Sequence, residues 1–175
     1  DRDITVKHGA YNVENIKVEP DWSAAAFWYE MVSLSDGAEV LLKNLNINSL
    51  QADSAAIKMF EWLGVKTIAT ENGVIARKTT ANSQQPKANS QQPTAFNFKD
   101  CPDLFPAIIA ACAGNRVNAT FTGLKNLSIK ESDRKQAMMN ELMKINITFE
   151  DVSDDELKMF CPNELPYFTK ENPIV

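Results

Sequence analysis

Apolar and polar residues along the chain follow two periods, one typical of helices and one typical of strands. Residues 23–34 are apolar nearly all round and rich in small side chains, which predicts a helix buried in a packed body. Residues 38–42 follow the Asp36-Gly37 break and predict a strand. The next apolar residues recur at helical spacing, at Ala56, Ile57, Phe60 and Leu63. They predict an amphipathic helix, followed by two strands at 66–69 and 73–76 that a tight turn joins.

The second half of the chain repeats this order of elements. The pattern predicts, in sequence, a strand at 96–98, an apolar helix at 107–113 that Gly114 ends, a strand at 116–121, an amphipathic helix at 134–144 and strands at 145–149 and 157–160. Asp21 and Asp103 each precede an apolar helix, and Asp53 and Asp133 each open an amphipathic one. Because matching positions lie about 80 residues apart, we interpret the chain as an internal repeat.

The repeat predicts an α/β fold of βαβαββ units, with mixed sheets packed around buried helices. We expect a first unit at 20–98 and a second at 99–175, with strand-like runs at 4–7 and 16–18 before them. A mobile loop is predicted at 79–95, where ANSQQPK is followed by ANSQQPT, and we favour a neutral insertion over a binding motif there. Two such units leave one face uncovered, so we expect a third unit or another domain, and hence a piece of a larger protein.

Composition and charge narrow the class of protein. The chain has 175 residues, of which 44% are hydrophobic and 23% charged, enough for one globular domain or two small subdomains. A net charge of −5 without a basic stripe argues against a nucleic-acid or anionic-membrane partner, and no window approaches the roughly 20 apolar residues of a membrane span. Three cysteines without a CxxC motif and a single histidine argue against a metal site. They predict reduced, buried thiols in a cytoplasmic protein.

The chemically most informative stretch is 123–134. It places Lys130, Glu131 and Arg134 at the start of a predicted helix, where free backbone amides and the helix dipole favour an anion. Arg134 can bind a carboxylate or phosphate with two hydrogen bonds, Lys130 adds a charge, and Glu131 can donate or accept a proton. The same stretch also fits a capping box from Ser128 to Glu131 at a solvated helix end, and the pattern alone leaves both interpretations open.

Asp103 is the second candidate. It precedes an apolar helix, where the simplest role of a carboxylate is to cap the helix, and its counterpart Asp21 allows the same interpretation. Because equivalent positions in repeated units lie on the same rim, we expect Asp21, Asp103 and residues 130–134 to converge. Groups that act on one small substrate must be in near contact, so a distance above about 15 Å between Asp103 and Arg134 would exclude this convergence.

Four motifs, in order and at compatible spacing, resemble those of one enzyme family. They are VEPDWSAA at 18–25, NSLQAD at 48–53, PDL at 102–104 and KESDR at 130–134. The chain resembles EPSP synthase (3-phosphoshikimate 1-carboxyvinyltransferase) over nearly its whole length outside the glutamine-rich loop. Its Ala24, Ala25 and Ala52 depart from the usual serines and glycine of these motifs. The KESDR motif after a TGL-type turn favours this family over the related UDP-N-acetylglucosamine enolpyruvyl transferases, which share the fold.

The resemblance implies a transferase with a specific reaction. Family members move the enolpyruvyl group of phosphoenolpyruvate to the 5-hydroxyl of shikimate 3-phosphate, in the shikimate pathway of aromatic amino acid biosynthesis, without a metal or organic cofactor. By motif match, Asp103 is the catalytic proton acceptor near that hydroxyl, and Glu131 is the proton donor to the methylene carbon. Asn126 and Lys130 match contacts to the shikimate phosphate, and Arg134 matches a contact to phosphoenolpyruvate.

The resemblance also implies that the chain is part of an enzyme. Family members have two domains of three βαβαββ units each, with the active site between them. Residues 1–19 resemble the closing strand region of the preceding domain, and the rest resembles two units of the carboxy-terminal domain. The family's amino-terminal Lys and Arg motif and its DHRMAM-type segment have no match here. We therefore expect the isolated chain to be inactive without the missing domain and to self-associate through its uncovered face, whereas the alternative is a non-catalytic repeat or binding module.

Overall fold

The computed structural model of the protein describes residues 3–10, 12, 14–79, 94–127 and 132–166. The helices and strands are, in order, α1 (Trp22–Leu34), β1 (Glu39–Lys43), α2 (Ala56–Trp62), β2 (Val65–Thr70), β3 (Gly73–Lys78), β4 (Thr94–Asn97), α3 (Phe105–Gly114), β5 (Ala119–Thr122), α4 (Arg134–Met143), β6 (Thr148–Ser153) and β7 (Glu156–Phe160). Short 3₁₀ helices at Ala52–Ala55 and Pro102–Leu104 lead into α2 and α3. The loop predicted at 79–95 lies almost wholly outside the described residues, as do Lys130 and Glu131.

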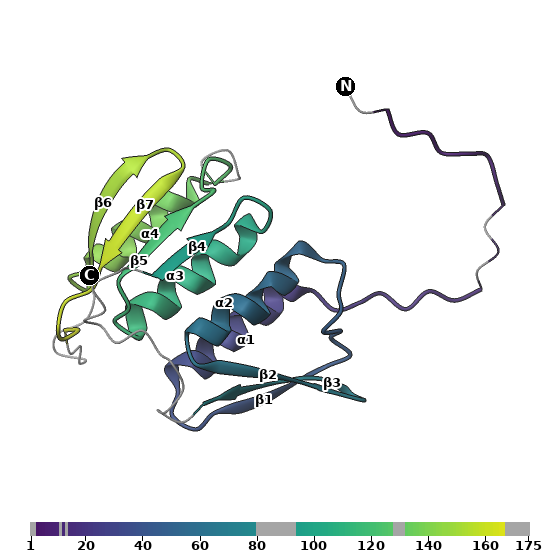
Figure 1. Cartoon of the computed structure of the whole chain (residues 1–175), viewed down its shortest axis with the longest axis horizontal. Coiled ribbons are helices and arrows are strands. Elements are labelled where there is room, and N and C mark those ends of the chain that lie inside the picture. Colours follow the sequence, from purple (N-terminus) through teal and green to yellow (C-terminus); the bar gives the residue numbers. More distant parts are fainter. Residues whose placement is uncertain (1–2, 11, 13, 80–93, 128–131, 167–175) are drawn as a thin grey trace.

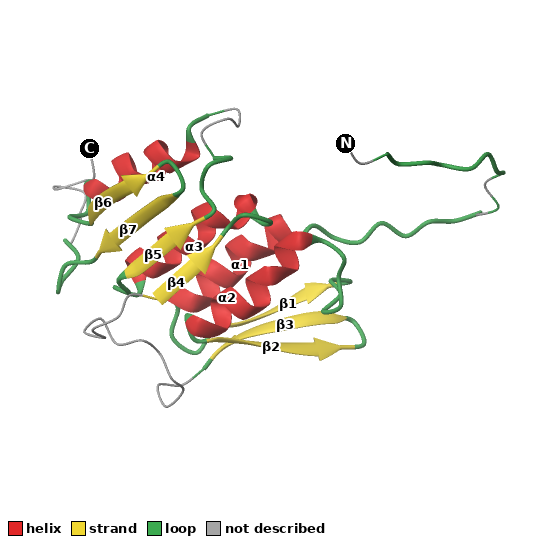
Figure 2. Ribbon diagram, turned by 45° about the horizontal axis from the view of Figure 1, so that its top comes forward, coloured by secondary structure: helices red, strands yellow, loops and turns green. Residues whose placement is uncertain are grey.

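The strands form one sheet in each half of the chain (Figure 1). The first sheet is antiparallel, with the strand order β1-β3-β2. The second has the order β4-β5-β7-β6, in which β4 runs parallel to β5 and the other pairs are antiparallel. Thus β1, β3 and β2 occupy the places of β5, β7 and β6, and the repeat seen in the sequence is also a structural repeat. Helices α1, α2 and α3 lie between the two sheets (Figure 2).

The strands predicted at 4–7 and 16–18 are not formed. Both runs belong to an extended segment that leads away from the two sheets (Figure 1), and neither has a ladder partner among the described residues. The side chains of Ile4, Ile16 and Val18 are 80–90% exposed. Alternation of apolar and polar residues produces a strand only where a neighbouring strand satisfies its backbone groups, and the segment has no such neighbour here.

The strand β4 belongs to the second half of the fold. It pairs along its length with β5, from Thr94 opposite Ala119 to Asn97 opposite Thr122. The unit boundary placed after residue 98 from the sequence leaves β4 in the first unit, whereas its pairing joins it to the second sheet. The division of the chain into domains stays a prediction, but the second sheet itself begins at Thr94.

The core is continuous across the two halves. Its largest fully buried side chains include Trp22, Tyr29 and Phe60 from the first half and Phe98, Phe105 and Phe121 from the second. Helix α3 packs between α1 and α4, and seven of its ten residues are buried. Helix α1 differs from the prediction, because one side of it is open, with Phe27, Trp28, Met31 and Leu34 between 46% and 55% exposed.

The contact between α1 and α3 depends on Gly114. The sequence suggested that this glycine ends α3 by its backbone freedom, but the residue with a positive φ at this helix end is Arg116, at 56°. A Cβ atom at Gly114 would lie 2.4 Å from a methyl carbon of Leu34. Gly114 therefore provides room for α1 to approach α3. The chain turns at Arg116, in the left-handed conformation, and the next strand begins at Ala119.

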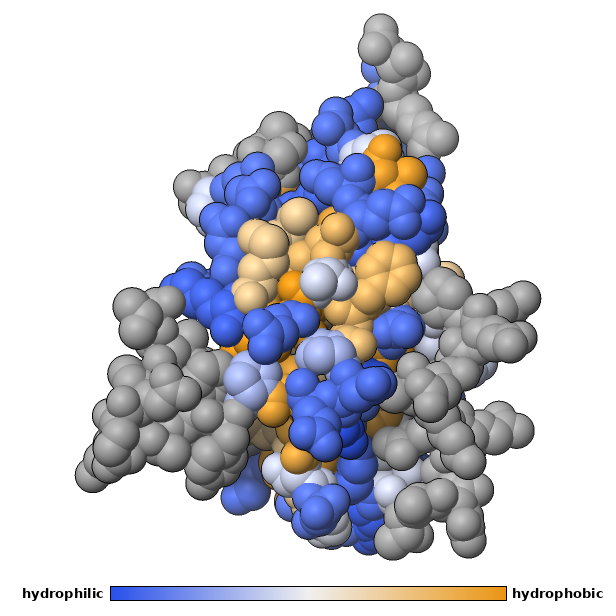
Figure 3. Space-filling model, turned by 90° about the vertical axis from the view of Figure 1, so that its left-hand side faces the viewer, coloured by the Kyte–Doolittle hydropathy of each residue, from blue (hydrophilic) through white to orange (hydrophobic). Residues whose placement is uncertain are grey.

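The surface combines apolar and polar regions. Figure 3 shows the side of the molecule on which β6 and β7 lie, and apolar side chains gather in the middle of this face with polar ones around them. The large apolar side chains exposed on α4, β6 and β7 are Met143, Val152 and Phe160. Over the part of the chain that the structure describes, no helix has the length and apolar character needed to cross a membrane.

Candidate functional site

The candidate residues lie on the segments that follow the two parallel strands. The segment after β4 leads through Lys99 to Asp103, and the segment after β5 leads through Gly123 to Asn126. Because β4 and β5 are parallel neighbours, both segments leave the same edge of the sheet. Ligands of open α/β sheets bind outside the carboxyl ends of the strands, so this edge is where a substrate site is expected.

The two segments are packed directly against each other. The backbone N–H of Phe98 donates to the carbonyl of Thr122 at 2.8 Å, which extends the pairing of the strands by one residue. The next residue, Gly123, has a φ of 74°, and a Cβ atom there would lie 2.3 Å from the backbone nitrogen of Lys99. Only glycine fits this conformation at this distance, so Gly123 sets the spacing between the two segments.

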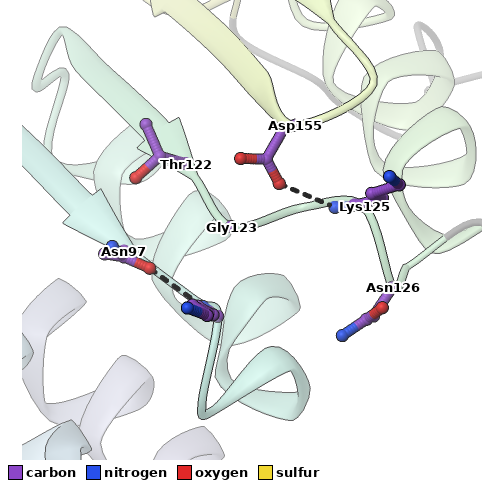
Figure 4. A pocket seen from close by; sticks show the side chains of 7 residues that line it. Asn97, Thr122, Gly123, Lys125, Asn126 and Asp155 are labelled. Carbon is purple, nitrogen blue, oxygen red and sulfur yellow. Dashed lines mark hydrogen bonds between the residues drawn. The ribbon is translucent and has the colours of Figure 1, made fainter.

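A cavity of about 380 Å³ opens between these segments (Figure 4). It is lined by Asn97, Lys99, Thr122, Gly123, Lys125, Asn126 and Asp155. Its volume falls within the range of pockets that hold small molecules. Two lysines, one carboxylate and three neutral hydrogen-bonding side chains surround it, a set suited to a polar ligand that carries negative charge and hydroxyl groups.

Hydrogen bonds fix the walls of this cavity. The side-chain oxygen of Asn97 accepts from the backbone N–H of Lys99 at 2.9 Å. On the opposite wall, the backbone N–H of Lys125 donates to Oδ1 of Asp155 at 3.2 Å, and Figure 4 shows the Asp155 carboxylate turned toward that amide. The cavity thus has backbone walls that side chains from β4 and from the β6–β7 turn hold in place.

Asp103 and Arg134 form an ion pair beside these loops. A terminal nitrogen of the Arg134 guanidinium lies 2.6 Å from Oδ1 of Asp103, with 29% and 40% of the two side chains exposed. The pair joins residues 31 positions apart in the sequence. The distance is far below the limit of about 15 Å set for groups that act on one substrate, so the structure brings these two predicted site residues together.

The two aspartates that match in the repeat differ in their local role. Asp21 caps α1, because its carboxylate accepts from the backbone N–H groups of Ser23 at 3.0 Å and Ala24 at 3.1 Å. Asp103 does not cap α3, since it lies inside the 3₁₀ helix Pro102–Leu104 and its carboxylate turns to Arg134. The expected convergence therefore brings together Asp103 and Arg134, whereas Asp21 serves the start of its own helix.

Arg134 is positioned by the start of α4. It is the first residue of this helix, and its backbone N–H donates to the carbonyl of Leu127 at 3.4 Å. The N-cap of α4 is Asp133, whose carboxylate accepts from the backbone N–H of Gln136 at 3.0 Å. Glu131 and Lys130, the remaining candidates, lie outside the described residues, and their roles stay predictions.

Sequence reasoning missed four residues of the cavity: Asn97, Lys99, Thr122 and Asp155. Asn97 and Thr122 are polar residues at the ends of buried strands, a signal that the sequence does offer. Asp155 lies in a run of acidic residues between two strands, where nothing distinguishes it from its neighbours. Across the described ranges, no group of three or more His, Cys, Asp or Glu side chains is placed to hold a metal ion.

The model of the family EPSP synthase (3-phosphoshikimate 1-carboxyvinyltransferase) matches residues 1–160 of the chain. The chain belongs to the EPSP synthase family. This finding confirms the resemblance inferred from the four motifs.

Individual EPSP synthases agree with the family assignment. A 3-phosphoshikimate 1-carboxyvinyltransferase of Bacteroides fragilis is 35% identical over 157 residues, which cover 90% of this chain and 36% of that protein. One from Clostridium perfringens is 27% identical over 154 residues, or 87% of this chain and 34% of that protein. The chain therefore spans about a third of the length of these curated relatives.

A solved structure supports the fold. The EPSP synthase of Acinetobacter baumannii superposes with a TM-score of 0.60 at 23% sequence identity, over 86% of this chain and 34% of that one. The mixed α/β architecture expected from the sequence is thus confirmed as that of an EPSP synthase.

Proposed function

We propose that this chain forms part of the active site of a 3-phosphoshikimate 1-carboxyvinyltransferase. In this reaction the 5-hydroxyl of shikimate 3-phosphate attacks phosphoenolpyruvate, and phosphate leaves. The observation that carries the proposal is the ion pair of Asp103 and Arg134, which joins the segment that follows β4 to the first residue of α4. The cavity at the ends of β4 and β5 is lined by the earlier part of the same segment and by the segment that follows β5. The family assignment supplies the reaction, and the proposal requires neither a metal nor an organic cofactor.

The geometry suits the roles proposed for Asp103 and Arg134. A carboxylate that accepts a proton from a hydroxyl must be held in one orientation beside it, and the guanidinium of Arg134 provides such a hold at 2.6 Å. The guanidinium of Arg134 is planar and carries several N–H groups, a shape that suits the carboxylate or phosphate of phosphoenolpyruvate. In this proposal the carboxylate of Asp103 acts on the hydroxyl of shikimate 3-phosphate, and the adjacent guanidinium of Arg134 binds phosphoenolpyruvate.

Asn126 is the described residue proposed to contact the shikimate phosphate. Its side chain lines the cavity together with Lys99 and Lys125 (Figure 4), whose charges favour a phosphate there. We propose Lys130 as a second phosphate contact and Glu131 as the proton donor, both on motif match alone. The remaining contacts are proposed to come from a domain that this chain does not contain, and the complete enzyme is proposed to act in the cytoplasm.

The proposal is tested by titrating isotope-labelled chain with shikimate 3-phosphate and with phosphoenolpyruvate, and following amide chemical shifts. We expect shifts at Asp103, Asn126 and their neighbours. Arg134→Ala is expected to weaken the response to phosphoenolpyruvate at least roughly ten-fold, because a charged contact is lost. The matched control is Arg77→Ala, since Arg77 pairs with Glu39 on the other sheet. No response at these residues at millimolar ligand would refute the proposal.

The same titration discriminates the alternatives. A response to UDP-N-acetylglucosamine without one to shikimate 3-phosphate would favour the related sugar-nucleotide transferase. Binding of none of these ligands would favour a non-catalytic module. We also propose that the chain alone releases no phosphate from the two substrates, because it spans about a third of its relatives. A phosphate assay on the purified chain checks this directly.

A further inference from the structure

The turn between β6 and β7 supports the loop that carries Asn126. Two successive amides of this loop donate to one residue of the turn: the backbone N–H of Leu124 to the carbonyl of Asp155 at 3.4 Å, and that of Lys125 to its Oδ1 at 3.2 Å. The backbone N–H of Asp155 donates to Oγ of Ser153 at 3.2 Å, which orders the turn itself. The residue that directly precedes Asn126 is thus anchored to a hairpin 30 positions further along the chain.

The other side of the loop has its own support. Gly123 packs against the backbone of Lys99, so the loop is held between the segment after β4 on one side and Asp155 on the other. At its far end, the backbone N–H of Leu127 donates to the carbonyl of Leu124 at 2.8 Å and closes a tight turn around Asn126. The position of Asn126 therefore depends on a short turn whose first residues are fixed by Gly123 and Asp155.

Asp155 has two effects on an anionic ligand, and they are opposite in sign. Its carboxylate lines the same cavity as Lys99, Lys125 and Asn126, so its charge repels a phosphate there. Its hydrogen bond to the backbone of Lys125 places the loop that would bind that phosphate. Because an asparagine keeps the acceptor oxygen and removes the charge, the two effects can be separated by substitution.

We propose that Asp155 is a positioning residue for the site, which holds the Asn126 loop in the conformation that binds the phosphate-bearing substrate. The role is exerted through the backbone of Lys125 and not by contact with the ligand. It rests on the proposed function for the identity of that substrate, but the anchoring of the loop is independent of it. The β6–β7 hairpin then has a part in substrate binding, although it carries none of the residues that the family motifs assign.

The test compares Asp155→Ala with Asp155→Asn by titration of the 175-residue chain with shikimate 3-phosphate. Loss of the anchor in Asp155→Ala is expected to weaken binding roughly five-fold, the effect of one lost hydrogen bond of ordinary strength. Asp155→Asn is expected to bind as tightly as the parent or more tightly. The control is Asp154→Ala, a neighbouring carboxylate that lines a separate cavity with Lys135 and Gln136.

Hydrogen exchange without ligand keeps this test separate from that of the proposed function. Asp155→Ala should speed exchange of the Leu124 and Lys125 amides, and Asp155→Asn should not. If the parent chain fails to bind shikimate 3-phosphate but the exchange result holds, the proposed substrate is wrong and the anchor stands. Tighter binding by both Asp155 variants, or unchanged exchange in Asp155→Ala, would overturn the positioning role.

Discussion

Asp21 and Asp103 occupy matching places in the repeat but have different partners. Both follow a proline, yet Asp21 remains outside α1 and caps it, whereas Pro102 opens a 3₁₀ turn that includes Asp103. The sequence suggested Asp103 as a candidate because of its position and motif. It does not determine that the carboxylate meets Arg134, because that contact depends on how the start of α4 packs after a turn of the chain. The sequence predicted the single residues of the site and the convergence of Asp103 with residues 130–134, but not the direct ion pair.

Gly123 allows a prediction with an internal control. Gly37 has a similar φ, 65°, but apart from its chain neighbours no described residue has an atom within 4 Å of the place where its Cβ would be. Gly123, at 74°, faces the backbone of Lys99 at 2.3 Å. Gly37→Ala is expected to cost about 1 to 2 kcal/mol of unfolding free energy from backbone strain alone. Gly123→Ala adds a clash with backbone and should cost roughly 3 kcal/mol or more. Urea unfolding of both variants measures the difference, and equal costs would contradict the close approach.

The three cysteines allow a prediction of pH dependence. Burial raises the pKa of Cys101 to about 11, with smaller contributions from Asp53 and Asp100, and burial raises the pKa of Cys161 to about 11. Burial also raises the pKa of Cys112 well above its usual value near 9, with a smaller contribution from Cys161. The native thiols are therefore protonated at pH 8 and should react slowly with a disulfide reagent. In urea, where the chain is unfolded, the three thiols should react at the rate of exposed cysteines. Rapid reaction of the native protein at pH 8 would contradict these environments.

The same thiols affect stability in alkaline solution. A folded pKa above the unfolded one means that the neutral thiol is favoured by folding, so its contribution is complete below about pH 9. That contribution is lost as the pH rises from about 9 to about 11. The midpoint of urea unfolding should fall across this window, and replacing Cys101 and Cys161 with alanine should reduce the slope of the fall.

At the level of elements, the spacing of apolar residues and the positions of turn-forming residues predicted most helices and strands to within a few residues. The predicted helices 23–34, 107–113 and 134–144 correspond to α1, α3 and α4. The failures have one physical origin, since a strand needs a partner that local pattern does not show. Residues 16–18 alternate but pair with no strand among the described residues. β4 pairs with β5 across the segment that contains α3, and so belongs to the second sheet.

The ends of three helices meet at Lys78, the last residue of β3. Its ammonium donates to the carbonyl of Ser33 near the end of α1, to the carbonyl of Leu63 at 3.4 Å after α2, and to Oδ1 of Asn115 at 3.4 Å after α3. Desolvation by burial lowers the pKa of Lys78, and the charge of Asp36 opposes this shift. The arrangement is favourable because a cation is stabilised at helix carboxyl ends.

Replacing Lys78 is therefore expected to loosen the junction of the two halves. Lys78→Met removes the donor and leaves the carbonyls of Ser33 and Leu63 without it, which should cost about 1 to 3 kcal/mol of unfolding free energy. Lys66→Met, on an exposed position of β2, is the control and should cost little. Thermal or urea unfolding measures both, and greater stability of Lys78→Met would mean that the desolvation of the ammonium outweighs its hydrogen bonds.

At the level of the whole molecule, the repeat explains why α1 and α3 differ in burial although both are apolar nearly all round. Helix α3 has α1 on one side and α4 on the other, and it is covered. Helix α1 packs against α2, α3 and β3, and its remaining side shows Phe27, Trp28, Met31 and Leu34, which we call the α1 stripe. These residues follow the spacing of one helix face, so they form a continuous apolar surface.

The α1 stripe predicts that the isolated chain associates with a second copy of itself. Two identical apolar stripes can cover each other about a twofold axis, which removes both from water. Met31→Glu places a charge in the middle of the stripe, at a side chain that is 55% exposed, and should shift the chain toward the monomer without unfolding it. Leu50→Glu is the matched control, because Leu50 is fully exposed and lies outside the stripe. Sedimentation equilibrium over a range of concentrations measures the association, and a parent chain that stays monomeric throughout, or equal effects of the two substitutions, would show that the stripe does not mediate it.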